Sequence, residues 1–79
     1  MDRWQDHIST EGKLTFGKPV IKGTNITVES IMEKLASGWT EQQLLTYYPD
    51  LTVDDIKAVY AYAYDNIKNG LLWIQNRPR

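Results

Sequence analysis

Residues 52–69 read TVDDIKAVYAYAYDNIKN, and this stretch decides the fold. Its centre, VYAYAY, alternates in the way that a half-buried strand does. A helix is favoured instead, because no glycine or proline interrupts the stretch and Gly70 follows it as a stop. Thr52 supplies an N-cap, and Asp54 and Asp55 place carboxylates in the first turn. We therefore predict a helix here, whose apolar face comprises Ile56, Val59, Tyr60, Ala63 and Ile67.

Two shorter helices are predicted upstream of this one. The first begins after the cap residue Thr27, ends near Gly38, and has one apolar face formed by Val28, Ile31, Met32 and Leu35. The second begins at Thr40, where TEQQ has the form of a capping box, and stops at Pro49. Its apolar side chains are Leu44, Leu45 and Tyr48. The predicted fold class is mainly α, a three-helix helix-turn-helix domain of homeodomain-like or winged-helix-like type.

A β-hairpin is predicted over residues 13–28, directly before the first helix. Its polar part reads GKPVIKGTNITV, with turn residues between two apolar pieces. Pro19 cannot donate a ladder hydrogen bond, so its strand should lie at an edge or begin there. Gly23 and Asn25 are the residues best able to adopt positive φ. The hairpin is interpreted either as a ribbon over the edge of the core, with lysines for solubility, or as a wing that contacts DNA.

The whole chain, 1–79, is expected to form a single domain with a lead at 1–12 and a tail at 70–79. The tail contains an apolar run, Leu71, Leu72, Trp73 and Ile74. We expect this run either to fold back onto the core or to form an exposed patch that binds a partner.

Composition excludes several classes of protein. The chain has 79 residues, 42% of them hydrophobic, and no cysteine, so neither disulfides nor thiolate metal sites are available. No apolar run is long enough to span a membrane, and a cytoplasmic protein is expected. The net charge is −1, which does not favour nucleic acid, although residues 13–34 carry four lysines against two glutamates.

Catalysis is not expected, and no cofactor or metal site is predicted. His7 is the single histidine, and we expect it in a solvated loop. Asp54 and Asp55 are adjacent, so on a helix they diverge by about 100° and cannot act as a facing pair. No phosphate-binding glycine pattern is present.

Nucleic-acid binding is the better candidate. The second and third helices, joined by YYPDLT, would form a helix-turn-helix with the last helix in the recognition position. The residues predicted to contact DNA are Lys18, Lys22, Thr24, Asn25, Gln42, Gln43, Thr46 and Lys57. Asp54 and Asp55 complicate this prediction, because phosphates would repel carboxylates at the start of the recognition helix.

From Gly17 to about Tyr64 the sequence resembles the bacterial domain-of-unknown-function family 433. The specific pieces are GKPVI, GTNITV and YPDLT, which match the family's G-K-P-x-I, G-T-R-I-T-V and Y-P-x-L-T. The resemblance implies a helix-turn-helix preceded by a β-ribbon. It also implies an antitoxin-like role for some members, which bind their own operator and PIN-like nuclease partners. Asn25 stands where the family usually has arginine, which removes a charge and a bidentate donor.

Two hypotheses for function follow. The first is a dimeric, DNA-binding, antitoxin-like protein that binds its operator, a PIN-like toxin, or both. The second is a protein-interaction module without DNA binding, which would use Leu71–Ile74, together with Trp39 and Tyr62 if these are exposed.

Overall fold

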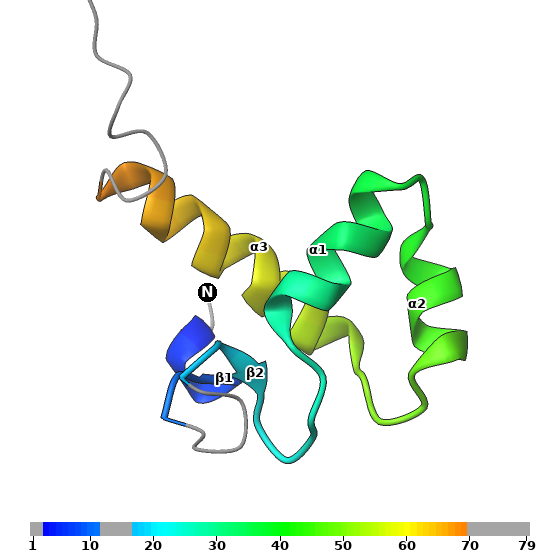
Figure 1. Cartoon of the computed structure of the whole chain (residues 1–79), viewed down its shortest axis with the longest axis horizontal. Helices are drawn as coiled ribbons and strands as arrows, with labels where there is room; N and C mark the ends of the chain where they lie inside the picture. The colour runs from blue at the N-terminus through cyan, green and yellow to red at the C-terminus, as the bar shows by residue number, and fades with distance from the viewer. Residues whose placement is uncertain (1–2, 12–16, 70–79) are drawn as a thin grey trace, which may run out of the picture.

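The computed structural model describes residues 3–11 and 17–69, and within them the chain forms three α-helices and a small antiparallel sheet (Figure 1). The elements in order are η1 (Trp4–Asp6, a 3₁₀ turn), β1 (Ile8–Ser9), β2 (Val20–Ile21), α1 (Val28–Ala36), α2 (Glu41–Tyr47) and α3 (Val53–Lys68). This arrangement confirms the mainly helical class and the small ribbon near the N-terminus that the sequence predicts.

Each helix begins at the threonine that the sequence indicates. The Thr27 hydroxyl accepts from Ser30 N at 3.0 Å, at the start of α1. Thr40 and Gln43 form a complete capping box at the start of α2, with bonds of 2.8 and 3.1 Å. Thr52 opens α3 in the same way. Because each cap satisfies backbone N–H groups that have no partner within the helix, three residues of one type fix three boundaries.

The VYAYAY stretch is helical, as predicted, but its exposed side was predicted wrongly. Ile56 and Val59 are buried, whereas Tyr60 is 47% exposed and Ile67 is 49% exposed. Met32, which the sequence assigns to the apolar face of α1, is 42% exposed. On α3 the difference arises because the core covers only one stripe of the helix, and Tyr60 and Ile67 lie beyond its edge.

The ribbon contains a strand pairing that the sequence did not predict. β2 pairs with β1, in the register Ile8 with Ile21 and Ser9 with Val20, so part of the N-terminal lead is a strand. On its other side β2 turns back tightly, and Ile21 N donates to Ile26 O at 2.9 Å. Gly23 in this turn has φ 81°, a conformation that favours glycine. The predicted pairing across this turn is present as a single antiparallel bridge between Val20 and Thr27, and Val28 N donates to Pro19 O at 3.0 Å. Residues 12–16, the start of the predicted hairpin, are outside the described part.

The core gathers side chains from every element except η1. Its fully buried members are Ile21, Ile31, Leu44, Ile56 and Val59, and Ile8 of β1, which is also buried, packs with them. Partly buried aromatic side chains pack against it, including Trp4, Trp39 and Tyr62. The tail prediction for Leu71–Ile74 lies outside the described residues. Within the described part, no helix is both long enough and apolar enough to span a bilayer.

Candidate functional site

The outer side of α3 carries a line of large, exposed apolar side chains. Val53 and Ile67 are each 49% exposed, Tyr60 is 47% exposed and Tyr64 is 64% exposed. Together with Lys57 these residues form what we call the α3 face. Exposure on this scale is informative because such side chains are normally covered, and a contiguous exposed apolar strip marks an interaction surface.

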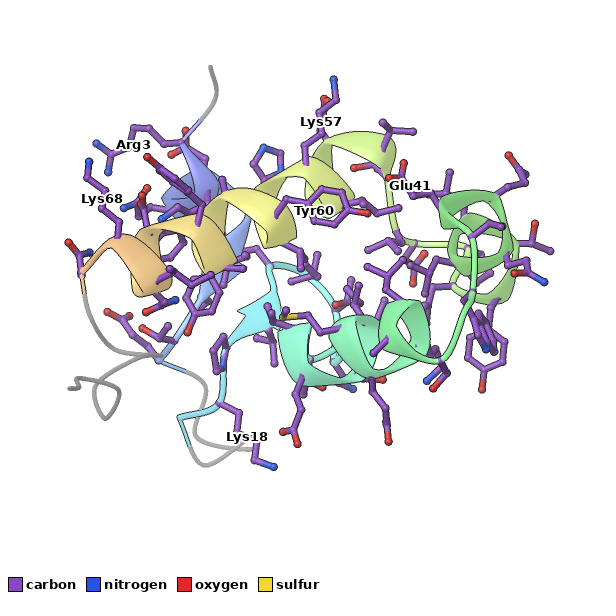
Figure 2. The ribbon with its side chains drawn as sticks, turned by 90° about the horizontal axis from the view of Figure 1, so that it is seen from above. Arg3, Lys18, Glu41, Lys57, Tyr60 and Lys68 are labelled. Atoms are coloured by element: carbon purple, nitrogen blue, oxygen red, sulfur yellow. The ribbon has the colours of Figure 1, made fainter. Side chains whose placement is uncertain are left out.

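An open groove of about 910 Å³ runs beside this face, between η1 and α3. Two tyrosines and three cations line it: Tyr60, Tyr64, Arg3, Lys57 and Lys68. Figure 2 shows Arg3 and Lys68 at the same end of α3, with Lys57 toward its other end. The groove therefore offers aromatic surface between positive charges.

Trp4 fixes the wall of the groove. Its indole Nε1 donates to Asp65 Oδ2 at 2.6 Å, and its ring meets Tyr62 edge-on with centroids 4.8 Å apart. Edge-to-face aromatic pairs and hydrogen bonds to a charged acceptor are both stabilising. Tyr62 is consequently half-buried, so it does not meet the condition of exposure under which the second hypothesis would add it to the partner-binding residues.

Tyr60 is held in place from α2. Its hydroxyl donates to Glu41 Oε2 at 2.9 Å, and the two side chains point toward one another in Figure 2. Partial burial and the adjacent carboxylate raise the pKa of the Tyr60 phenol above its ordinary value of 10.0. Because this bond already restricts the Tyr60 ring, the Tyr60 side chain loses less conformational entropy when a partner packs on it.

A second cluster surrounds Lys34 at the junction of α1 and α2. The Lys34 ammonium lies 5.7 Å from the ring centroid of Trp39, 5.4 Å from that of Tyr47 and 5.5 Å from that of Tyr48, distances typical of cation–π contacts. Hydrogen bonding to Tyr48 raises the pKa of Lys34. Burial raises the pKa of Tyr48, but its hydrogen bonds with Ser30 and Lys34 outweigh burial and leave that pKa below 10.0. Trp39 is partly buried as a result, and we interpret this cluster as a structural contact that joins α1 to α2.

His7 and Asp55 correct two expectations at once. His7 Nδ1 lies 2.9 Å from Asp55 Oδ1, with 23% of the His7 side chain and 12% of the Asp55 side chain exposed. His7 is therefore not a solvated loop residue. Asp55 also accepts from Thr52 N at 3.1 Å, so its carboxylate joins the α3 cap to the N-terminal segment and does not face outward as Asp54 does.

The predicted DNA-contacting residues of the turn lie near the α2–α3 link. Thr24 and Asn25 line a second, smaller cleft whose other wall is residues 48–50. The Thr24 hydroxyl is engaged within the turn, since it donates to Ile21 O at 2.8 Å and accepts from Ile26 N at 3.0 Å. Lys22 is exposed, and Lys18 Nζ lies 3.2 Å from Glu29 Oε1.

The other predicted contacts lie elsewhere. Gln42, Gln43 and Thr46 are exposed on α2, but the Gln43 side chain is used in the capping box and the Thr46 hydroxyl donates to Gln42 O. Lys57 belongs to the α3 groove, and Figure 2 shows it on the opposite side of the molecule from Lys18. The set does not form one surface on a single chain.

Sequence reasoning missed Trp4, Tyr64 and Asp65 as parts of a site. A signal for the α3 face was present, because its five residues follow one another at intervals of four, three, four and three. No such signal exists for the bond between Trp4 and Asp65, which lie 61 residues apart.

A family model, described as a protein of unknown function (DUF433), matches residues 8–63. The chain belongs to this family. The match spans both strands, α1, α2 and most of α3, and it confirms the family to which the GKPVI, GTNITV and YPDLT pieces point. No curated protein and no solved structure matches the chain.

The chemistry available at the α3 groove is that of binding. It combines phenol rings, an indole and exposed cations, while its carboxylates Asp54 and Asp65 lie on the same helix as two of its lysines. Across residues 3–11 and 17–69, no group of three or more histidine, cysteine or carboxylate side chains is placed to hold a metal ion.

Proposed function

We propose that this protein acts by binding another protein chain on the α3 face, as the antitoxin-like member of a toxin–antitoxin-type pair. The observation that carries the proposal is the line of four half-exposed apolar side chains on α3. Covering such side chains contributes about 25 cal/mol per Å² of apolar area, so a partner helix or sheet edge that packs there gains directly. The antitoxin-like role and a PIN-like nuclease as partner come from the family resemblance.

Charge also favours a protein partner over DNA. The first turn of α3, which a recognition helix would present to DNA, carries Asp54 exposed and Asp55 just beneath it. Glu41 stands beside the same surface through its bond to Tyr60. Phosphates would be repelled by these carboxylates, whereas the side chains of a protein partner can pair with them.

Site-specific photo-crosslinking tests this proposal. Tyr64 is replaced by p-benzoylphenylalanine in cells that produce the chain together with a PIN-like nuclease of the kind that the family resemblance implies, and the matched control carries the same group at Met32, which is exposed on α1. We expect an adduct with the nuclease or with a second copy of the chain at position 64 and not at position 32. Equal labelling at both positions, or no protein adduct at position 64, would refute the proposal.

Operator binding is the second candidate function. It is favoured by the cleft between the 22–25 turn and the α2–α3 link, where Asn25 lies at the edge of a helix-turn-helix-like succession of α2 and α3. Residues 48–52 form that link, a length close to the short turn that such motifs use. Lys22 adds one exposed cation beside it.

A fluorescence-anisotropy titration against the chain's own upstream DNA tests this second function. If Lys18 and Lys22 of two protomers meet phosphates, log K should fall with log salt with a slope of about −4. Lys22→Gln should reduce the magnitude of that slope by about 1 for each protomer. Lys34→Gln is the control and should leave the slope unchanged, because Lys34 packs against Trp39, Tyr47 and Tyr48. Binding no tighter than to random DNA at low salt would exclude operator recognition.

A further inference from the structure

We infer that the chain that occupies the α3 face is a second copy of this protein, packed with the two α3 helices antiparallel about a two-fold axis at Ala61. The inference rests on the proposed function, since it names the partner of the same surface. It is carried by the spacing of the exposed residues, by the pattern of charge along α3, and by the small side chain at its centre.

The spacing suits a helix as partner. Val53, Lys57, Tyr60, Tyr64 and Ile67 follow the four-three alternation of a heptad seam, the narrow stripe through which one helix packs on another. Four of these five are large apolar side chains that are about half exposed or more. Ala61 lines the same groove as the two tyrosines, and its small side chain allows two helix backbones to approach closely where they cross.

The charged side chains along α3 favour a second copy of the chain as the partner and an antiparallel packing of the two α3 helices. In an antiparallel pair, residues equally far from the centre on either side face one another. Asp54 and Lys68 each lie seven residues from Ala61, and Lys57 and Asp65 each lie four residues from it. All four side chains line the α3 groove. A two-fold axis at Ala61 therefore opposes a carboxylate to an ammonium at all four places, which is the self-complementarity that an isologous interface requires.

A parallel pair of the same helices is disfavoured. It would place each of these residues beside its own copy, so that like charges meet at Asp54, Lys57, Asp65 and Lys68. The antiparallel arrangement also brings Tyr60 of one chain near Tyr64 of the other: Tyr60 lies one residue before Ala61 and Tyr64 three residues after it, so the two rings are offset by about 3 Å along the helix axis. Aromatic pairing then fills the middle of the seam.

Two contacts within the chain prepare this surface. Trp4 holds Asp65 through Oδ2, and a carboxylate retains acceptor capacity for a lysine of the other copy. Glu41 holds the Tyr60 ring, the middle residue of the seam, by accepting a hydrogen bond from its hydroxyl at 2.9 Å. Because α3 has 16 residues and spans about 24 Å, the interface is small, and a reversible, concentration-dependent dimer is expected.

Sedimentation velocity on the full chain tests the inference. The wild type should move from the 9.2 kDa monomer toward a dimer as its concentration rises from about 1 to about 200 µM. Asp54→Lys alone and Lys68→Asp alone should each weaken the dimer about tenfold or more, because each opposes like charges twice. Glu33→Lys, an equal charge change at an exposed position on α1, is the matched control and should leave it unchanged.

Mixing the two weakened variants gives the decisive measurement. In the mixed pair, the lysine introduced at position 54 faces the aspartate introduced at position 68, and the other ends meet as native Lys68 and Asp54. We therefore expect the mixture to regain dimerisation that neither variant shows alone, with helical circular dichroism unchanged in both. A wild type that stays monomeric, or variants that dimerise as well as the wild type, would overturn the inference. A monomer whose position 64 still crosslinks to the nuclease would retain the proposed function while excluding this partner.

Discussion

Replacing Asp55 with alanine should destabilise the fold far more than replacing its neighbour Asp54. The Asp55 carboxylate accepts from Thr52 N at 3.1 Å and contacts His7 Nδ1 at 2.9 Å. Loss of the capping contact costs about 1 kcal/mol. Loss of the bond to a mostly buried imidazole, which is left without its acceptor, costs a further 1 to 2 kcal/mol or so. The expected total is about 2 to 3 kcal/mol, against about 0.3 to 1 kcal/mol for Asp54→Ala, for which the loss within the monomer is the interaction with the helix dipole.

Urea unfolding followed by tryptophan fluorescence measures this difference. A domain of 79 residues has a free energy of unfolding of roughly 4 to 12 kcal/mol. With a slope near 1 kcal/mol per molar urea, Asp55→Ala should lower the midpoint by about 2 to 3 M. His7→Ala and the double variant complete a cycle whose coupling free energy should be about 1 kcal/mol. Equal costs for the two aspartates, or a coupling free energy near zero, would show that the His7–Asp55 contact does not tie the N-terminal segment to α3.

Three further outcomes follow from the caps, the turns and the phenols. In an alkaline titration of tyrosine absorbance, Tyr48→Phe should remove a component that titrates below 10.0, and Tyr60→Phe should remove one that titrates above 10.0. Tyr48 ionises more readily in the folded than in the unfolded chain. The wild type should therefore gain stability over Tyr48→Phe as the pH rises from the folded pKa of Tyr48 to its unfolded pKa, and should lose this gain as the pH falls again. Gly38→Ala should cost about 1 to 2 kcal/mol in urea unfolding, because φ is 102° there although the space beside it is open. Thr40→Ala should cost about 1 kcal/mol in the same assay through loss of the α2 capping box, whereas Thr46→Ala on the same helix should cost less than half of that.

Features that depend on neighbours in the sequence were predictable. The threonine caps, the glycine after α1 and the uninterrupted run in α3 act within one or two turns of the backbone, so the helix boundaries follow from short-range patterns. The helical state of VYAYAY belongs to the same class, because helix length and the absence of breakers outweigh a local alternation.

Features that depend on distant packing were not predictable. Nothing near Ile8 indicates that it pairs with Ile21, and nothing near His7 indicates Asp55, which lies 48 residues away. The exposure of Tyr60 and Ile67 also depends on distant packing. α3 carries two adjoining apolar stripes, and which of them is covered depends on where the other helices pack.

The groove has an unusual position relative to the part of the chain that defines the family. The family match ends at residue 63 and begins at residue 8, so Trp4 and Asp65, whose bond builds the groove wall, both lie beyond it. Tyr64 and Lys68 lie beyond it as well. The proposed binding surface therefore lies partly outside the residues that the family model matches, so substitutions at Trp4, Tyr64 or Lys68 should alter partner choice while leaving the matched helices and strands in place.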